Sequence, residues 1–234
     1  MDAVASGHMP RALVAAGEAH ALGDACAGLE QDGFEVERVS GLPALVGAAR
    51  ALPPDVIIID IGVPGGGAVE ACRAVREFSD AYVIVACPLP DEVSAVLALS
   101  VGADDVVCSG TSGREMAARA RAMLRRPRAV PARGGPYIVG GVEVDPMERR
   151  AGTQVGDIDL TRTEFEILAV LAEAQPAVVE RGRLVERVWG TGWVPDDHVL
   201  DVHVSNLRRK LVAARAGAAV VTVRGVGFRV DPAA

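Results

Sequence analysis

The chain has few aromatic residues and almost no lysine. Phe, Trp and Tyr make up 3% of its 234 residues, and Lys210 is the sole lysine among 24 basic residues. Hydrophobic residues reach 50%, mainly as Ala and Val. No uninterrupted apolar run reaches the roughly 18 residues that a membrane-spanning helix needs. The composition therefore predicts a soluble protein with no membrane partner.

The four cysteines lack the spacing of a zinc site or of a redox pair. They are Cys26, Cys72, Cys87 and Cys108. Their apolar surroundings favour reduced, buried thiols in a cytoplasmic protein, and neither a metal nor a cofactor is expected. Residues 1–10 show no signal-peptide pattern and resemble a cloning leader or tag, with Met9 as the natural start.

Charge is divided unevenly along the chain, whose net charge is −7. Residues 1–125 carry 9 basic and 17 acidic side chains (−8), and residues 126–234 carry 15 and 14 (+1). Residues 198–234 alone hold six basic and two acidic side chains (+4). A basic carboxyl-terminal segment on an acidic protein indicates a nucleic-acid partner, although a solvated charged face is the alternative.

The first half alternates apolar runs with amphipathic segments. The predicted strands are Arg11–Ala16, Phe34–Val39, Asp55–Asp60, Ala81–Cys87 and Asp104–Cys108. The predicted helices are His20–Gln31, Leu42–Leu52, Ala68–Phe78, Asp91–Val101 and Ser112–Arg125. Five strand–helix pairs predict an α/β fold, a doubly wound parallel (βα)5 sheet, in residues 11–126. Asp60 ends a fully apolar run, so it either lies at the rim where such sheets bind ligands or caps the turn before Pro64.

Several motifs in this half resemble the receiver domain, the phospho-acceptor module of bacterial response regulators. They are Pro54–Asp60, Val63–Gly65, Gly102–Asp105 and Arg114–Glu115. The resemblance places Asp60 at the phospho-acceptor position. It also implies an acidic pair that holds Mg²⁺, a hydroxyl residue and a lysine around that aspartate.

This chain departs from the receiver pattern at each of those supporting positions. The acidic pair is replaced by Ala16 and Gly17, with only Glu18 nearby. Cys87 stands at the hydroxyl position and Ser109 at the lysine position. We therefore expect a degenerate receiver in which Asp60 is not phosphorylated in the usual way.

The altered pocket has three interpretations. It is a vestige in a domain that only holds a dimer together, it retains residual phosphorylation, or it binds a small molecule. In the last case, the small residues Ala16, Gly17, Ser109, Gly110 and Gly65–Gly67 leave a cavity. That cavity would admit an uncharged or cationic ligand beside Asp60 and Glu18.

The receiver resemblance also implies a homodimer. Its face would comprise the fourth helix, the fifth strand and the fifth helix, joined by acid–arginine pairs. The candidates are Asp104, Asp105, Arg114, Glu115, Arg119 and Arg121. Val96, Leu99 and Met116 are expected to add apolar contacts, because surface ion pairs each contribute little. A solvated acidic face is the competing interpretation.

Residues 127–136 are rich in proline, glycine and arginine, which predicts a linker. Beyond it, residues 137–234 begin with predicted strands at Tyr137–Val144, near Arg149–Arg150 and at Val155–Leu160. Thr161 and Glu164 have the spacing of a capping box that begins a helix. Further helices are predicted at Val179–Trp189 and Asp197–Ala214, and a hairpin at Val220–Val230 with Arg224 near its tip.

This half resembles the winged helix-turn-helix DNA-binding domain of the OmpR/PhoB family. The matching segments are Leu160–Leu168, Val185–Trp189, Asp201–Leu211 and Thr222–Arg229. The resemblance implies that the third helix enters the major groove of DNA and that the hairpin, or wing, lies along the minor groove. Trp189 and His203 are expected to be packed residues.

The same resemblance assigns candidate DNA contacts. Bases or adjacent phosphates would be reached by His198, Val199, Val202, Ser205, Asn206 and Arg209. Asn206 has the geometry to pair with adenine and Arg209 with guanine, and Arg224 would enter the minor groove. Arg208 either contacts bases, or only braces the domain or binds phosphate. Asp201 is expected to pair with Arg208 or Arg224.

Together these features predict a transcriptional regulator with no catalytic activity. It would bind tandem half-sites in double-stranded DNA as a dimer, spaced by about 10–10.5 bp. Control would be constitutive, concentration-driven or exerted by a small-molecule effector. The alternative is a conventional two-component response regulator phosphorylated at Asp60 by a histidine kinase.

Overall fold

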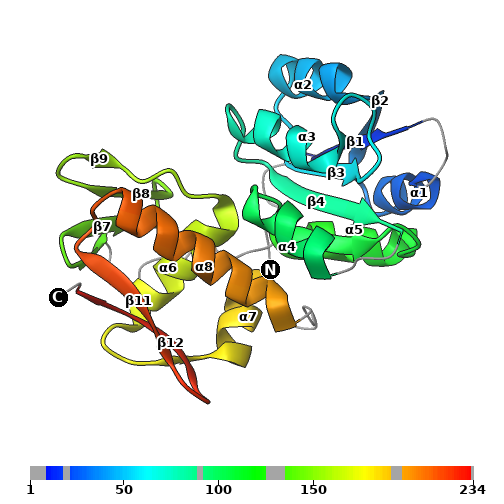
Figure 1. Cartoon of the computed structure of the whole chain (residues 1–234). Helices are drawn as coiled ribbons and strands as arrows, with labels where there is room; N and C mark the ends of the chain where they lie inside the picture. The colour runs from blue at the N-terminus through cyan, green and yellow to red at the C-terminus, as the bar shows by residue number, and fades with distance from the viewer. Residues whose placement is uncertain (1–8, 18–21, 89–91, 125–134, 191–196, 233–234) are drawn as a thin grey trace. The chain divides into compact units, whose positions relative to one another are not determined.

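The computed structural model describes residues 9–17, 22–88, 92–124, 135–190 and 197–232, without the side chains of residues 92, 197 and 198 (Figure 1). The chain divides into two compact units, residues 1–125 and 126–234, and each is described by itself. Most of the predicted leader and of the predicted linker lies outside the described residues. No helix within the described ranges is long and apolar enough to cross a bilayer.

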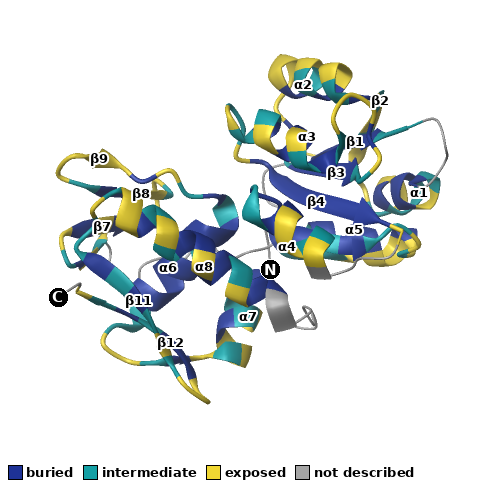
Figure 2. Cartoon of the chain, in the orientation of Figure 1, coloured by how far each residue is buried: buried dark blue, intermediate teal, exposed yellow. Residues whose placement is uncertain are grey.

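The first unit contains a five-stranded parallel sheet in the order β2-β1-β3-β4-β5. Its strands are β1 (Arg11–Ala16), β2 (Glu35–Ser40), β3 (Val56–Asp60), β4 (Tyr82–Cys87) and β5 (Asp105–Cys108). The apolar runs are buried on both faces because helices cover both sides of the sheet (Figure 2). The predicted doubly wound (βα)5 fold is confirmed.

Among the described residues of this unit, five helices follow the strands. They are α1 (Gly23–Gln31), α2 (Leu42–Ala51), α3 (Gly67–Arg76), α4 (Glu92–Ser100) and α5 (Gly113–Leu124). α1 and α5 cover one face, where they pack on alternate residues of the sheet such as Val14, Ile58 and Ile84. α2, α3 and α4 contact one another in series. After α4 the chain turns through Gly102, whose φ of 111° suits glycine.

α1 and α5 approach each other closely where both carry glycine. A Cβ built on Gly28 would lie 2.1 Å from the backbone carbonyl of Gly113, so neither position has room for a side chain. Asp24 reinforces the contact, because its Oδ2 accepts a hydrogen bond from the Gly113 amide at 2.7 Å. The first turn of α1 is therefore held against the first turn of α5.

The described part of the second unit combines two antiparallel sheets with three helices. One sheet has the order β6-β7-β8-β9 and the other the order β10-β12-β11. The strands are β6 (Tyr137–Val139), β7 (Val142–Asp145), β8 (Arg150–Thr153), β9 (Gly156–Asp157), β10 (Val179–Glu180), β11 (Ala218–Val223) and β12 (Gly227–Pro232). The helices are α6 (Arg162–Ala174), α7 (Arg181–Trp189) and α8 (Asp197–Ala213). The β11–β12 hairpin is the predicted wing, and the winged-helix fold is confirmed.

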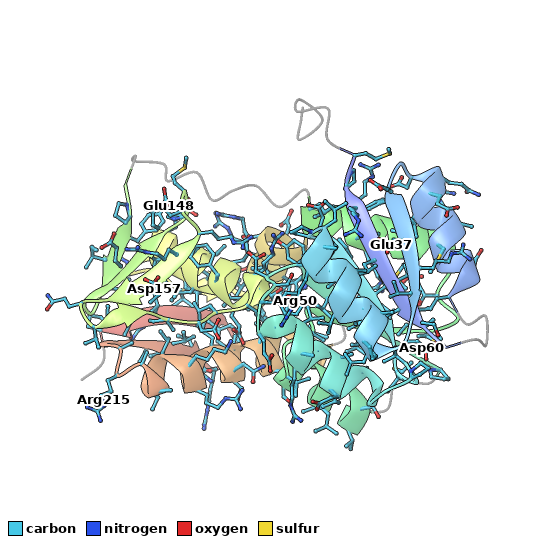
Figure 3. All side chains as sticks on the ribbon, turned by 90° about the horizontal axis from the view of Figure 1, so that it is seen from above. Glu37, Arg50, Asp60, Glu148, Asp157 and Arg215 are labelled. Atoms are coloured by element: carbon cyan, nitrogen blue, oxygen red, sulfur yellow. The ribbon has the colours of Figure 1, made fainter. Side chains whose placement is uncertain are left out.

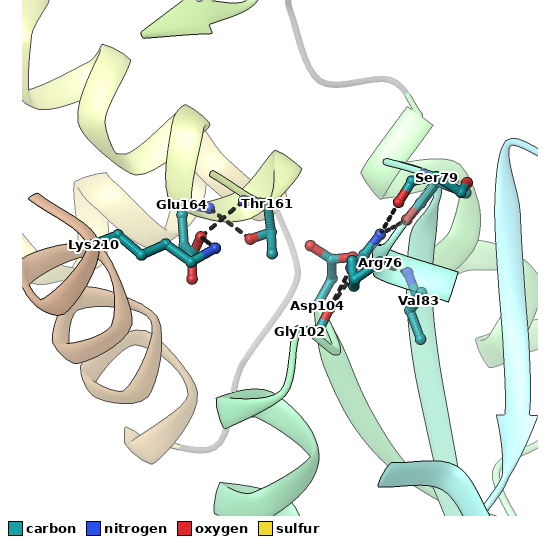
Figure 4. A network of polar contacts seen from close by, with 9 residues as sticks. Arg76, Ser79, Val83, Gly102, Asp104, Thr161, Glu164 and Lys210 are labelled. Carbon is teal, nitrogen blue, oxygen red and sulfur yellow. Dashed lines mark hydrogen bonds and ion pairs between the residues drawn. The ribbon is translucent and has the colours of Figure 1, made fainter. Parts of the chain in front are cut away.

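The predicted capping box at the start of α6 is present. The Thr161 hydroxyl accepts from the Glu164 amide, and Glu164 Oε2 accepts from the Thr161 amide at 2.8 Å. The same carboxylate is 2.7 Å from Lys210 Nζ on α8, so the sole lysine joins two helices (Figure 4). Glu164 is buried, and the cation compensates its charge there.

Three predicted elements of this unit were too long. The strand predicted at Tyr137–Val144 is a hairpin of β6 and β7, because the chain turns at Gly140 and Gly141, both with positive φ. The strand predicted at Val155–Leu160 is reduced to Gly156–Asp157, because Val155 lies 96% exposed in the turn before it. The helix predicted from Val179 begins at Arg181. Val179 and Glu180 instead pair with Phe228 and Gly227 of β12, a long-range pairing that helical periodicity does not reveal.

Candidate functional site

The carboxyl-terminal rim of the parallel sheet holds Asp60. It ends β3, beside Ala86 of β4, and it lies at one end of the sheet (Figure 3). Cys87 and Cys108 end the next two strands in register. Asp60 is half-exposed, and its Oδ1 accepts a hydrogen bond from the Gly62 amide at 2.8 Å. The carboxylate thus reaches the rim and also caps its own turn, so both interpretations of this residue are represented.

The positions around Asp60 carry uncharged side chains. Ala16 ends β1 and Gly17 follows it, while Glu18 lies outside the described residues. The Cys87 thiol is buried and donates to the Val107 carbonyl at 3.7 Å. The Ser109 hydroxyl is buried without a hydrogen-bond partner among the described residues. Nothing at these four positions can neutralise a phosphoryl group.

The described residues contain no cluster of three or more His, Cys, Asp or Glu side chains that could hold a metal. Three of the four thiols are buried, as predicted, but Cys108 is half-exposed and donates to the Pro88 carbonyl at 3.1 Å. Burial raises the pKa of the Cys72 thiol to about 12, which keeps it neutral. The expectation that all four thiols are buried was therefore wrong for Cys108, which lies at the open rim of the sheet.

A cavity of about 370 Å³ lies beside Ala16 and Gly17. Its wall is completed by Val14, Leu22, Gly23, Cys26, Arg38, Val39 and Ser40. Asp60, Cys87 and Ser109 do not line it. The small residues at the end of β1 therefore leave space on the α1 and β2 side of the sheet.

Asp104 was wrongly assigned to a dimer face. Its side chain is fully buried and forms an ion pair with Arg76 of α3, with Oδ2 2.7 Å from Nη2 (Figure 4). The same oxygen accepts from the Val83 amide at 2.8 Å. Arg76 also donates to the Gly102 carbonyl. Asp104 is therefore a partner within the unit that fixes the turn before β5.

The remaining charged candidates of that face divide into two groups. Asp105 is buried beside Arg119, with Oδ2 3.1 Å from Nη1, so it too was wrongly assigned to the dimer face. Burial raises the pKa of its carboxyl to about 6. Arg119 also contacts Glu115, which is exposed, as is Arg114. Arg121 instead pairs with Asp32 and lies over the Phe34 ring. Arg121 therefore braces α5 against the end of α1, and its place on the dimer face stays a prediction.

The apolar part of the predicted dimer face also needs correction. Leu99 and Met116 are almost fully buried within their own unit, because they point at the sheet. Val96 is 37% exposed, as expected. Its α4 neighbours Val93 and Leu97, which the prediction did not include, are 68% and 50% exposed. α4 thus carries three accessible apolar side chains.

α8 exposes part of the set of residues that the sequence suggested. Ser205 and Arg209 are exposed and Val202 is half-exposed, whereas the His198 side chain lies outside the described residues. Val199 and Asn206 are only 5% and 6% exposed, so they were wrongly assigned to bases. Asn206 Oδ1 accepts from Arg209 Nη2 at 3.2 Å. Val199 and Asn206 lie on the side of the helix that packs into the domain.

Arg208 ties α8 to the wing. Its Nε donates to the Val220 carbonyl and its Nη2 to the Thr222 hydroxyl, both at 2.7 Å. Of the two roles considered for this residue, the bracing role is the one observed in the structure. Arg224 lies exposed at the wing tip between β11 and β12, as predicted.

Asp201 pairs with a residue that the sequence did not suggest. Both of its oxygens accept from Arg181 at the start of α7, each at 2.8 Å, whereas Arg208 or Arg224 was expected. The Arg181 guanidinium also lies over the ring of Phe228, 5.3 Å from its centroid. Arg181 thus connects α7, α8 and β12 at the base of the wing. Trp189 and His203 are packed as predicted, with ring centroids 5.8 Å apart.

Comparison with known proteins agrees with this arrangement. Residues 154–230 match the family described as "Transcriptional regulatory protein, C terminal". The transcriptional regulatory protein PrrA of Mycobacterium tuberculosis is 39% identical over 222 residues, covering 94% of this chain and 95% of PrrA. CseB of Streptomyces coelicolor, also a transcriptional regulatory protein, is 38% identical over 219 residues, covering 86% of this chain and 89% of CseB.

This chain belongs to the OmpR/PhoB family of response regulators. It is a DNA-binding transcriptional regulator, and proteins of this family bind DNA and dimerise. Among solved structures, a mutant of the protein RitR aligns with 95% of this chain and 99% of its own, with a TM-score of 0.76. At 19% identity that likeness supports the fold alone.

Sequence reasoning missed two features of these sites. Arg181 could not be paired with Asp201 because the α7–α8 contact depends on tertiary packing. Arg38, in the cavity wall, could have been noticed in the sequence, because it stands where the alternation of apolar residues at Phe34 and Val36 predicts a third apolar residue. Its position in the wall depends on how β2 pairs with β1.

Proposed function

We propose that this regulator acts as a dimer on tandem half-sites and that its activity does not depend on phosphorylation of Asp60. The observation that carries the proposal is the set of side chains around Asp60. At the ends of the neighbouring strands stand Ala16, Gly17, Cys87 and Ser109, none of which is charged.

Phosphoryl transfer requires charge neutralisation more than covalent chemistry from the protein. The transferred group spreads negative charge over three oxygens, which metal ions and cationic side chains normally stabilise. In enzymes, removing one such preorganised donor costs about 2.7–4 kcal/mol of transition-state stabilisation. With several partners replaced, we expect transfer to Asp60 to be slower by many orders of magnitude. The domain then has no catalytic activity of its own.

The second candidate is a conventional response regulator that a histidine kinase phosphorylates at Asp60. Two observations favour it. Asp60 is half-exposed at the carboxyl end of β3, and relatives such as PrrA match almost the whole chain. Under this alternative the protein would still need a cation to replace the missing partners.

A labelling experiment separates the two candidates. Full-length protein is incubated with acetyl phosphate and Mg²⁺, and its intact mass is measured beside that of the Asp60→Asn variant. We expect no phosphoryl adduct that depends on Asp60, and equal DNA affinity for the two proteins. Stoichiometric labelling of the wild type that is absent from D60N would establish the conventional mechanism.

We propose DNA contacts from the exposed residues of the second unit. Val202, Ser205 and Arg209 lie on the exposed side of α8, which would enter the major groove, and Arg224 would reach the minor groove. Arg209 is the residue suited to paired hydrogen bonds with guanine. One winged unit would occupy each half-site, with half-sites about 10–10.5 bp apart.

The proposed dimer contact is on the first unit. Val93, Val96 and Leu97 give α4 an accessible apolar surface, and Arg114 and Glu115 supply exposed charges on α5. Apolar burial would contribute more of the association energy than these exposed charges do. Moving the half-sites apart by half a helical turn should abolish cooperative binding if the dimer contact is present.

A further inference from the structure

The face of β2 that α1 covers carries polar side chains near its end. In the parallel register, Arg38 lies beside Val14 and Ser40 beside Ala16 of β1. Val36, two residues earlier on the same face, packs against the core with Val14 and Ala16. Since strand residues alternate between faces, Arg38 and Ser40 continue the side on which Val36 is packed. Both side chains are exposed, because β2 is the edge strand of the sheet, so the arginine borders a space that is open to solvent.

These residues border the cavity of about 370 Å³ described above. Val14, Leu22, Cys26 and Val39 supply apolar lining, and Arg38 and Ser40 supply polar groups. Small-molecule sites typically measure about 300–1,000 Å³ and combine a mostly apolar wall with a few placed polar groups. A water molecule takes about 30 Å³, so this space would hold roughly ten waters or one small organic molecule.

Arg38 is the one charged side chain among the described lining residues. No carboxylate in the described part of the chain forms an ion pair with it, and the neighbouring Glu37 is paired with Arg11. Arg38 forms a hydrogen bond with the Cys26 thiol, whose pKa is raised by burial. The thiol is therefore neutral, and Arg38 is the cationic group that a ligand in the cavity would meet.

We propose that this cavity binds a small organic anion with an apolar body. Its anionic group would accept hydrogen bonds from the Arg38 guanidinium and the Ser40 hydroxyl, and its body would lie against Val14 and Leu22. Guanidinium groups bind carboxylates through two parallel hydrogen bonds, which fixes the ligand's orientation. The site is distinct from Asp60, and the charge of Arg38 requires an anion in place of the neutral or cationic ligand expected from the sequence.

The contacts of α1 supply a route from this cavity to α5. Gly23 forms part of the cavity wall, and the next residue, Asp24, accepts the hydrogen bond from Gly113 at the start of α5. α5 also carries Arg119, which is paired with the buried Asp105 of β5. This inference rests on the proposed function, because it supplies a signal that replaces phosphorylation.

The test measures binding of benzoate and octanoate to the full-length protein by isothermal titration calorimetry and by thermal shift. Benzamide and octanamide are the matched neutral probes. We expect both anions to bind and to raise the melting temperature, and the amides to bind at least tenfold more weakly. Equal binding of anions and amides, or no binding of either anion, would overturn the proposal.

Two variants locate the bound anion. Arg38→Met keeps the aliphatic stem and removes the charge, and we expect it to weaken benzoate binding at least tenfold. Arg73→Met removes an exposed arginine from α3, where it lies 3.6 Å from Glu70, and should leave binding unchanged. Circular dichroism establishes that both variants are folded. Unchanged binding to R38M, or equal losses in both variants, would place the anion elsewhere and refute the assignment.

Failure of this inference is distinguishable from failure of the proposed function. If Asp60 is not labelled and no anion binds, the cavity proposal is wrong and independence from phosphorylation stands. If Asp60 is labelled stoichiometrically and R38M still abolishes benzoate binding, the cavity is a ligand site on a conventional response regulator.

Discussion

Arg208→Ala tests whether α8 positions the wing. The substitution removes two hydrogen bonds by which α8 holds β11, one to the Val220 carbonyl and one to the Thr222 hydroxyl. Arg224, at the tip of the same hairpin, is exposed. Loosening the hairpin should therefore weaken DNA binding even if Arg208 never touches DNA.

The size of the effect follows from the two contacts. Hydrogen bonds to charged groups contribute about 1.5–3 kcal/mol each when well formed. Arg208 is half-exposed, so water compensates part of that loss, and we take about 1–2 kcal/mol for the pair. If this energy is needed to hold the wing on DNA, affinity should fall by about 5–30-fold.

Fluorescence anisotropy with a labelled operator duplex and with single-base variants of it provides the assay. R208A should lose affinity for all duplexes in similar proportion, with faster hydrogen exchange of the wing amides. Thr222→Val keeps the net charge and removes one acceptor, so it should reproduce part of the loss. Arg209→Ala carries the same charge change but should relax base preference instead.

A phosphate-binding role for Arg208 would give a different pattern. T222V would then bind normally, wing exchange would be unchanged in R208A, and the slope of log affinity against log salt would fall by about 1. That combination would refute the bracing argument.

Three further predictions concern the wing, the α1–α5 contact and a buried carboxyl. Arg224→Ala should weaken binding to all sequences and lower the salt slope by about 1, measured by titration at several salt concentrations. Gly28→Ala should lower the free energy of unfolding by about 1–3 kcal/mol, because its Cβ would lie 2.1 Å from the backbone of Gly113. Gly47→Ala is the control: its Cβ would meet nothing within 4 Å, so it should stabilise α2 by about 0.5–1 kcal/mol. Urea unfolding measures both changes. Asp105 has a folded pKa of about 6 against an ordinary 3.8, so its contribution to stability is complete below pH 4 and is lost as pH rises through 6. The stability of the wild type relative to D105N should therefore fall by at most about 3 kcal/mol between pH 4 and pH 7 in denaturant titrations.

The architecture could be predicted because it is encoded by local patterns. The apolar run ending at Asp60 identified a central parallel strand, and the Thr161–Glu164 spacing identified the start of α6. The errors came where a partner far along the chain decides the outcome. Val179 and Glu180 have a helical pattern but are extended, because β12 supplies backbone partners for them.

The candidate sites were predicted less well, because charge in a sequence does not reveal whether a side chain is buried. Asp104 is of a residue type that is usually exposed, yet it is buried with Arg76 and the Val83 amide as its partners. Asn206 is of a residue type that often contacts bases, yet it lies on the buried side of α8. A shift of one position around a helix changes the direction of a side chain by about 100°, and motif matching does not resolve that difference.

The sequence by itself determined the two domain types, the position of Asp60 and the uncharged residues around it, because these depend on residue identity and order. Only the tertiary structure decided that Arg208 holds the wing, that Asp201 is paired with Arg181 and that Arg38 borders a cavity. Each of these depends on the distance between side chains on different elements, which packing sets once the chain has folded.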